Sequence, residues 1–199
     1  MANNIAKFMQ AATEPLADGT FGPGVRCSAY LNDGTYLPCV MLRTSGPVTR
    51  LALRRFRELA PTLFRRTSTP NYERVVKVFV AQGNRVNAYD IARVEESPFA
   101  MPLSLLPQIR GETSMAWTGF VLEMNDGVTF SFGTSFLMEF FNLPANYSFD
   151  GVSKVHNHSY VGATGTLKSL RPGSGAPPED YDARSVLRER PYFVCHVDA

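Results

Sequence analysis

The sequence of 199 residues lacks the long hydrophobic runs that place a chain in a membrane. No apolar run approaches the roughly 20 residues that a helix needs to cross a bilayer. The segment MANNIAKFMQAATEP at the N-terminus also lacks the continuous apolar stretch of a secretory signal peptide. We therefore expect a cytoplasmic protein that does not contact membranes.

Catalytic signatures are missing as well. The chain contains no GxxxxGK[ST] loop, no GxGxxG after a strand, no GxSxG and no HExxH. Residues 162–168, GATGTLK, resemble a phosphate loop only superficially, because the spacing differs and no helix is expected behind them. Many active sites leave no local signature, so these absences do not decide whether the chain is an enzyme. No cofactor is indicated.

Cysteine is scarce, with three residues and no CxxC pair. Cys27 and Cys39 would face each other across a predicted hairpin, and Cys195 lies near the C-terminus. Buried cysteines pack as small apolar residues, and thiols stay reduced in the cytoplasm. We expect a reduced, buried pair rather than a catalytic or disulfide-forming one.

Histidine is equally scarce, and the three residues all fall in the last quarter of the chain. His156 and His158 would point to one face of a strand, as a metal-binding pair requires. His196 would add a third ligand if the last strand lies alongside. A metal-dependent enzyme of the hydrolase type is therefore the alternative to a non-catalytic protein.

Apolar residues are plentiful between residues 115 and 143, around the turn Asn125-Asp126-Gly127. A three-residue hairpin loop of this kind needs glycine at its left-handed third position. Folding about it pairs Phe120 with Phe132, Leu122 with Phe130 and Met124 with Val128. A short helix over residues 135–141 is expected to follow, buried because it is apolar on all sides except at Glu139.

A second Asn-Asp-Gly turn, at residues 32–34, predicts a similar hairpin over residues 25–42. Its register places Tyr30 opposite Tyr36, Ala29 opposite Leu37 and Cys27 opposite Cys39. Pro38 cannot donate a ladder hydrogen bond, so its strand should lie at a sheet edge or be bulged there. A third hairpin is predicted across residues 75–94, with Lys77 facing Asp90.

Helical periodicity is clearest in residues 47–60, where the predicted apolar face comprises Val48, Ala52, Leu53, Phe56, Leu59 and Ala60. Shorter helices are predicted at residues 4–13, 103–109 and 179–190. Strands are predicted at residues 152–158 and 192–197, and residues 162–175 are expected to form a loop.

This order of elements indicates an α+β protein with a mainly antiparallel sheet built from three hairpins, with short helices packed against it. The length favours one domain over residues 1–199. Residues 1–16 would be a peripheral helix, and residues 171–178 would be a Pro/Gly-rich loop.

Charge is unevenly distributed, although the net charge is only +2. Residues 26–93 contain 12 basic and 4 acidic residues, whereas residues 94–199 contain 7 basic and 12 acidic residues. Arginine suits carboxylate and phosphate recognition because its guanidinium is planar and forms paired hydrogen bonds. The candidate partner-binding residues are Arg50, Arg54, Arg57, Arg65 and Arg66.

These arginines make a non-catalytic interaction or assembly module the leading hypothesis. Its partner would be an acidic protein surface, with self-association included. Binding to the backbone of a nucleic acid is a further alternative, which the scarcity of interleaved aromatic residues disfavours. A helix face that is merely solvated, or paired with the acidic half of the same chain, is the competing explanation.

Overall fold

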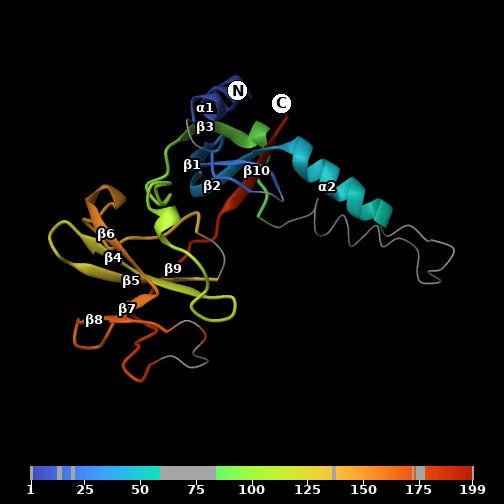
Figure 1. Ribbon diagram of the computed structural model, residues 1–199. Coiled ribbons are helices and arrows are strands. Elements are labelled where there is room, and N and C mark those ends of the chain that lie inside the picture. Colours follow the sequence, from blue (N-terminus) through green and yellow to red (C-terminus); the bar gives the residue numbers. More distant parts are fainter. Residues whose placement is uncertain are drawn as a thin grey trace, which may run out of the picture. The chain divides into compact units, whose positions relative to one another are not determined.

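The computed structural model describes residues 2–12, 15–18, 21–58, 84–135, 138–171, 173 and 178–198. These residues form a mixed α and β protein whose sheets are mostly antiparallel, and they contain two α-helices (Figure 1). The chain divides into two compact units: unit 1 comprises Met1–Ser97 and Tyr192–Ala199, and unit 2 comprises Pro98–Pro191. The single domain over residues 1–199 stays a prediction. No helix among the described residues is long and apolar enough to span a membrane.

Unit 1 contains a four-stranded sheet in the order β10-β2-β1-β3. The strands span Gly24–Leu31 (β1), Tyr36–Thr44 (β2), Ile91–Glu95 (β3) and Phe193–Val197 (β10). β10 runs parallel to β2, whereas the other neighbours are antiparallel. The strand predicted at residues 192–197 is therefore confirmed, and it lies beside β2.

The hairpin of β1 and β2 confirms the turn predicted at residues 32–34. Gly34 has a φ of 87°, in the left-handed region that glycine adopts without strain. The predicted pairing of Tyr30 with Tyr36 and of Ala29 with Leu37 is also correct. The local turn chemistry therefore determines the register next to the loop.

The predicted pairing of Cys27 with Cys39 is wrong, because Cys27 lies opposite Val40. The register shifts between Cys27 and Ala29, so that Pro38 and Cys39 together oppose Ser28. Proline lacks the backbone N–H that an unbroken ladder would require at its position. In a β-bulge one residue of the longer strand is left unpaired, so Pro38 is accommodated without a ladder hydrogen bond. Of the two alternatives predicted for Pro38, an edge or a bulge, the bulge is observed.

The N-terminal helix α1 (Ala2–Ala11) confirms the helix predicted at residues 4–13, and it packs on the main core of unit 1. Ile5 is fully buried, and Phe8, Met9 and Ala12 pack against the same cluster. The cluster also contains side chains from β1, β2, β3 and β10, namely Val25, Cys27, Ala29, Leu37, Val40, Leu42, Ile91, Cys195 and Val197. Docking of α1 therefore completes the core of unit 1.

Helix α2 spans Ser45–Glu58 and begins two residues before the predicted start. Ser45 donates a side-chain hydrogen bond of 2.8 Å to Asp198, which follows β10. A carboxylate at this end of a helix interacts favourably with the helix dipole. The parallel pairing of β10 with β2 thus brings an acidic group to a helix that has no acidic residue in its first turn.

Unit 2 contains a four-stranded sheet in the order β6-β4-β5-β9 and a small sheet of β7 and β8. These strands span Thr118–Met124 (β4), Thr129–Thr134 (β5), Val152–Asn157 (β6), Ser159–Val161 (β7), Leu167–Ser169 (β8) and Leu187–Arg188 (β9). The hairpin of β4 and β5 has the predicted turn and register, and Gly127 has a φ of 84°. The strand predicted at residues 152–158 is confirmed as β6.

An aromatic cluster forms the core beneath this sheet. Phe120 and Phe132 face each other across β4 and β5, and their stacked rings lie 5.2 Å apart. Phe141 meets both rings edge-on, at 5.7 and 5.5 Å. All three side chains are fully buried, so residues 115–143 do supply the hydrophobic centre of unit 2, as predicted.

The predicted helix over residues 135–141 is wrong for the described residues of that segment. Phe140 and Phe141 form isolated bridges to Ala100 and Glu189 instead. The backbone N–H of Phe141 donates to Phe99, and Arg190 donates to Phe140. Burial in the interior was predicted correctly, but an extended chain buries two consecutive phenylalanines with backbone partners on both sides.

The predicted helix over residues 179–190 is also wrong. Asp182 accepts a hydrogen bond from the backbone N–H of Arg184 through its side chain, and from Ser185 through its carbonyl. Such local bonds offer the backbone an alternative to a helix. The chain turns here and then joins β5 through β9.

Other short elements differ in detail. The loop predicted over residues 162–175 contains β8, and the helix predicted over residues 103–109 is reduced to the 3-10 turn Leu106–Gln108. Residues 75–83 of the third hairpin lie outside the described residues. The remainder is not one strand, because the 3-10 turn Ala88–Asp90 precedes β3, which pairs with β1.

Candidate functional site

The exposed face of α2 carries the predicted arginines that the structure describes. Arg50 and Arg54 are exposed, and Leu53 between them is 51% exposed. At 100° per residue these three positions share one face of the helix. We call this set of Arg50, Leu53 and Arg54 the α2 surface.

The opposite face of α2 differs from the prediction at one position. Val48 is buried as predicted, but Leu51 is buried in place of Leu53. Ala52 is half-buried. The side chains of Phe56 and Arg57, and residues 59–83 with Arg65 and Arg66, lie outside the described set.

The α2 surface is positively charged and contains an apolar side chain. The sequence of α2, SGPVTRLALRRFRE, has four arginines and one glutamate at its end. Among the described residues, no ion pair involves Arg50. A large apolar side chain flanked by guanidinium groups is the composition of an interface anchor, because arginine is enriched where proteins meet.

Arg43, which belongs to the same basic half of the sequence, does not contribute to this surface. Its side chain is 4% exposed in β2 and lies 2.9 Å from a carboxylate oxygen of Asp18. It also donates to the carbonyl of Gly22 at 2.5 Å. Arg43 therefore has a structural role, because it binds Asp18 and Gly22 and connects both residues to β2.

The three histidines are divided between the two units, with His156 and His158 in unit 2 and His196 in unit 1. His156 lies on β6 with Nε2 2.7 Å from a carboxylate oxygen of Glu123. His158 follows the end of β6 with a φ of 49°, so strand alternation does not align it with His156. His196 belongs to β10 of unit 1. No group of three His, Cys, Asp or Glu side chains in the described part of the chain is placed to hold a metal ion.

The three cysteines are buried and form no disulfide. Burial raises the pKa of Cys27 to about 12, with a further contribution from Cys195, whose own pKa burial raises to about 11. The nucleophilic form of cysteine is the thiolate, and these pKa values keep both thiols protonated at neutral pH. Cys27 and Cys195 are therefore packing residues.

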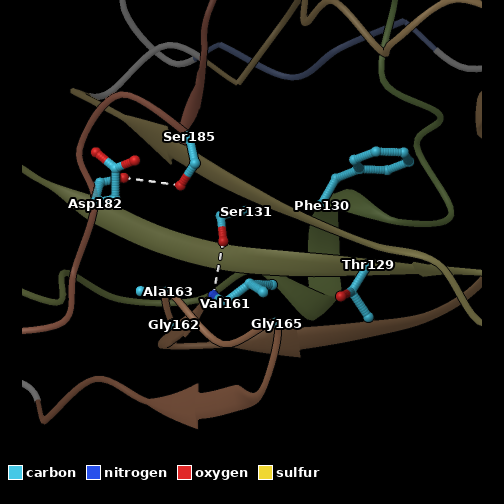
Figure 2. A pocket seen from close by; sticks show the side chains of 9 residues that line it. All are labelled: Thr129, Phe130, Ser131, Val161, Gly162, Ala163, Gly165, Asp182 and Ser185. Carbon is cyan, nitrogen blue, oxygen red and sulfur yellow. Dashed lines mark hydrogen bonds between the residues drawn. The ribbon is translucent and has the colours of Figure 1, made fainter.

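A pocket of about 430 Å³ lies in unit 2, and the sequence analysis did not identify it. Its walls are residues 129–131 of β5, residues 161–165 around the turn between β7 and β8, and the turn residues Asp182 and Ser185 (Figure 2). Ser131 accepts a 2.8 Å hydrogen bond from the backbone N–H of Val161. The volume lies in the range of pockets that bind small ligands, about 300–1,000 Å³.

A polar cluster holds one wall of this pocket in place. Asp180 accepts hydrogen bonds from Tyr160 at 2.6 Å and from Lys168 at 2.5 Å. The Lys168 hydrogen bond, followed by that of Tyr160, lowers the pKa of Asp180, and the hydrogen bond to Asp180 raises the pKa of Tyr160 to about 12. Gly162 belongs here for steric reasons, since a Cβ atom would lie 2.6 Å from Asp180. The cluster ties β7 and β8 to residues 180–181.

Sequence reasoning missed the pocket because its walls come from three separated segments. The only local signal was the glycine-containing stretch at residues 162–168, which was set aside because it lacks the spacing of a phosphate loop. Neither Asp182 nor Ser131 belongs to a recognisable motif. In comparisons with known proteins, no protein-family model, no curated protein and no solved structure matches the chain.

Proposed function

We propose that this protein is a non-catalytic interaction or assembly module that contacts an acidic protein surface through α2. The observation that supports the proposal best is the exposure of Leu53 between Arg50 and Arg54. Complete burial of an exposed leucine contributes about 1.5–3 kcal/mol, so burial of the exposed half of Leu53 at an interface would contribute about 0.8–1.5 kcal/mol. The flanking guanidinium groups restrict the choice of partner to surfaces that offer carboxylates.

The buried face of α2 supports a role for its exposed face. Val48 and Leu51 are buried on the other side of the helix, and Ser45 bonds to Asp198 at its start. Arg50 and Leu53 are exposed, so they are accessible to a partner.

The cytoplasm is the proposed location. Three buried cysteines that form no disulfide fit a compartment that keeps thiols reduced. A second copy of the chain is a natural acidic partner, because residues 94–199 carry five more acidic than basic residues.

The test replaces Arg50, Arg54 and Arg57 with serine in one variant. The matched control replaces three exposed arginines of unit 2, Arg110, Arg171 and Arg184, with serine, which removes the same charge. Binding is measured to a glutamate-rich peptide with interspersed leucines and to a short DNA duplex, and self-association is measured by sedimentation equilibrium.

We expect the α2 variant to lose binding to the acidic peptide by about tenfold or more, equal to about 1.4 kcal/mol, while the control keeps it. Stability should change by no more than about 0.5 kcal/mol, as for other exposed positions. Leu53→Ser should weaken binding with no change in charge. Loss of self-association in the α2 variant would identify the partner as a second copy.

Two results would contradict the proposal. Equal binding of the acidic peptide by the α2 variant and the control would show that the α2 surface is only a solvated helix face. Tighter binding to the duplex would indicate a nucleic acid instead. In that case the logarithm of affinity should fall linearly with the logarithm of salt, by about 0.9 per phosphate neutralised.

A further inference from the structure

The edge of β5 is only partly covered by its neighbour. β9 pairs with Phe132 and Gly133 and does not extend to residues 129–131. On its other side, β5 pairs with β4 along its whole length. The pocket in unit 2 lies where β9 is absent, beside residues 129–131.

The direction of the backbone groups on this edge follows from the hairpin. The N–H of Met124 donates to the carbonyl of Val128, so these two residues are a hydrogen-bonded pair of the antiparallel ladder. Such pairs alternate in an antiparallel ladder, which makes Leu122 and Phe130 the next bonded pair. Thr129 and Ser131 therefore direct their backbone groups away from β4, and the parallel bridge between Phe132 and Leu187 uses the carbonyl of Ser131. The N–H of Ser131 and both backbone groups of Thr129 are left on the pocket side.

The side chains agree with this arrangement. Figure 2 shows the Phe130 ring turned away from Thr129 and Ser131, as expected for alternating strand positions. In the same view Ser131 lies between the turn that contains Asp182 and residues 161–165. The pocket is therefore a slot beside the part of β5 that β9 does not cover, where Thr129 is half-buried and Ser131 is buried.

Charge in the slot comes from Asp182. Its side chain is exposed, and one carboxylate oxygen accepts a hydrogen bond from the backbone N–H of Arg184. No ion pair among the described residues involves Asp182, whereas the neighbouring Asp180 is paired with Lys168. The slot therefore presents one carboxylate that is not neutralised, next to walls that include the apolar Val161 and Ala163.

We propose that this slot binds a short peptide segment in extended form, which adds to the edge of β5 and places a lysine or arginine beside Asp182. Addition of a strand to an open sheet edge gains affinity from backbone hydrogen bonds and specificity from side-chain pockets. Ala163, an exposed residue in the turn after β7, contributes only a methyl group to the wall of the slot. This site is in unit 2 and is independent of the function proposed for α2.

The probe is the tripeptide Val-Lys-Val with an acetylated N-terminus and an amidated C-terminus, titrated into the full-length protein labelled with ¹⁵N. Two control peptides have the same length: Val-Glu-Val reverses the charge, and an N-methylated Val-Lys-Val cannot donate the central backbone hydrogen bond. Binding is followed by the amide shifts of residues 129–131 and 161–165.

Three variants test the geometry. Ala163→Phe fills the slot from an exposed turn position, and its thermal midpoint reports whether the fold is intact. Asp182→Asn removes the charge and keeps an oxygen to accept from Arg184. Asp150→Asn removes an exposed carboxylate elsewhere in the same unit and is the matched control.

We expect saturable shifts with Val-Lys-Val in the wild type and in Asp150→Asn. Asp182→Asn should weaken binding by roughly threefold to fivefold, the effect of one exposed ion pair. Ala163→Phe and the N-methylated peptide should abolish binding. The proposal is overturned if Val-Lys-Val shifts none of these amides, if Val-Glu-Val binds equally well, or if the N-methylated peptide binds as tightly as the parent.

Discussion

The contact between Trp117 and Gly133 gives the sharpest test of packing in unit 2. Gly119 and Gly133 lie opposite each other on β4 and β5, and the indole of Trp117 covers the Gly133 side of this pair. A Cβ atom added at Gly133 would overlap the indole ring. Arg188 lies above the same ring, with Cζ 4.4 Å from the centroid. Gly133→Ala therefore must displace Trp117.

The size and sign of the effect follow from two opposing contributions. Overpacking of a well-packed site costs about 1–3 kcal/mol. Alanine in place of a glycine inside a strand recovers about 0.5–1 kcal/mol of backbone entropy. Gly133→Ala should therefore destabilise the wild type by about 0.5–2 kcal/mol. In a Trp117→Ala background the same change should stabilise the protein by about 0.5–1 kcal/mol, because the overlap is gone.

The assay is a double-mutant cycle by urea unfolding, read by circular dichroism, together with tryptophan emission from the folded state. Trp117 is the only tryptophan, so the emission reports on this site alone. Gly127→Ala is the control: its positive φ makes it destabilising, but no atom lies within 4 Å of the added methyl, so the emission should not change. The coupling energy between Gly133→Ala and Trp117→Ala should equal the free-energy cost of the overlap, about 1–3 kcal/mol. A coupling below about 0.5 kcal/mol, or unchanged emission in folded Gly133→Ala, would refute the reasoning.

Two further predictions concern the turns and acid stability. Gly127→Val and Gly34→Val each place a β-branched residue at positive φ and should cost about 1–3 kcal/mol, seen as a lower thermal midpoint; unchanged midpoints would contradict the left-handed turns. Burial, then the charges of Arg85 and Arg43, lower the pKa of His196 from 6.5 to about 4. The unfolded chain therefore binds a proton in this range that the folded chain does not, and stability should fall as pH decreases from 6.5 to about 4. His196→Gln should show a smaller fall in urea-unfolding free energy over that range; an equal fall would assign the loss to other groups.

The parts of the fold that could be predicted from the sequence are those determined by neighbouring residues. Asn-Asp-Gly at two places specifies hairpin turns, because glycine alone enters the third position at little cost, and the register next to each loop follows. The helix predicted at residues 4–13 is likewise observed, as α1. The bulge opposite Ser28 changes only the pairing of Cys27, since it comes after the segment that the turn determines.

The errors occur where distant segments decide the structure. Residues 135–141 have no polar face, so their periodicity cannot distinguish a buried helix from an extended chain; bridges to Ala100 and Glu189 decide it. Residues 179–190 were predicted to form a helix. Asp180 instead binds Tyr160 and Lys168, some 20 and 12 residues earlier in the chain, and no periodicity encodes those contacts.

The two candidate sites differ in the same way. Helical spacing alone predicts that Arg50 and Arg54 share a face, because residues four apart on a helix are neighbours. The same spacing predicted that Leu53 would lie on the apolar face, but Leu53 is exposed. Because of this exposed leucine, the α2 surface offers apolar area to a partner as well as positive charge. The slot beside β5 depends instead on where β9 stops pairing, so a carboxylate at Asp182 becomes part of a site only because a strand is too short to cover residues 129–131.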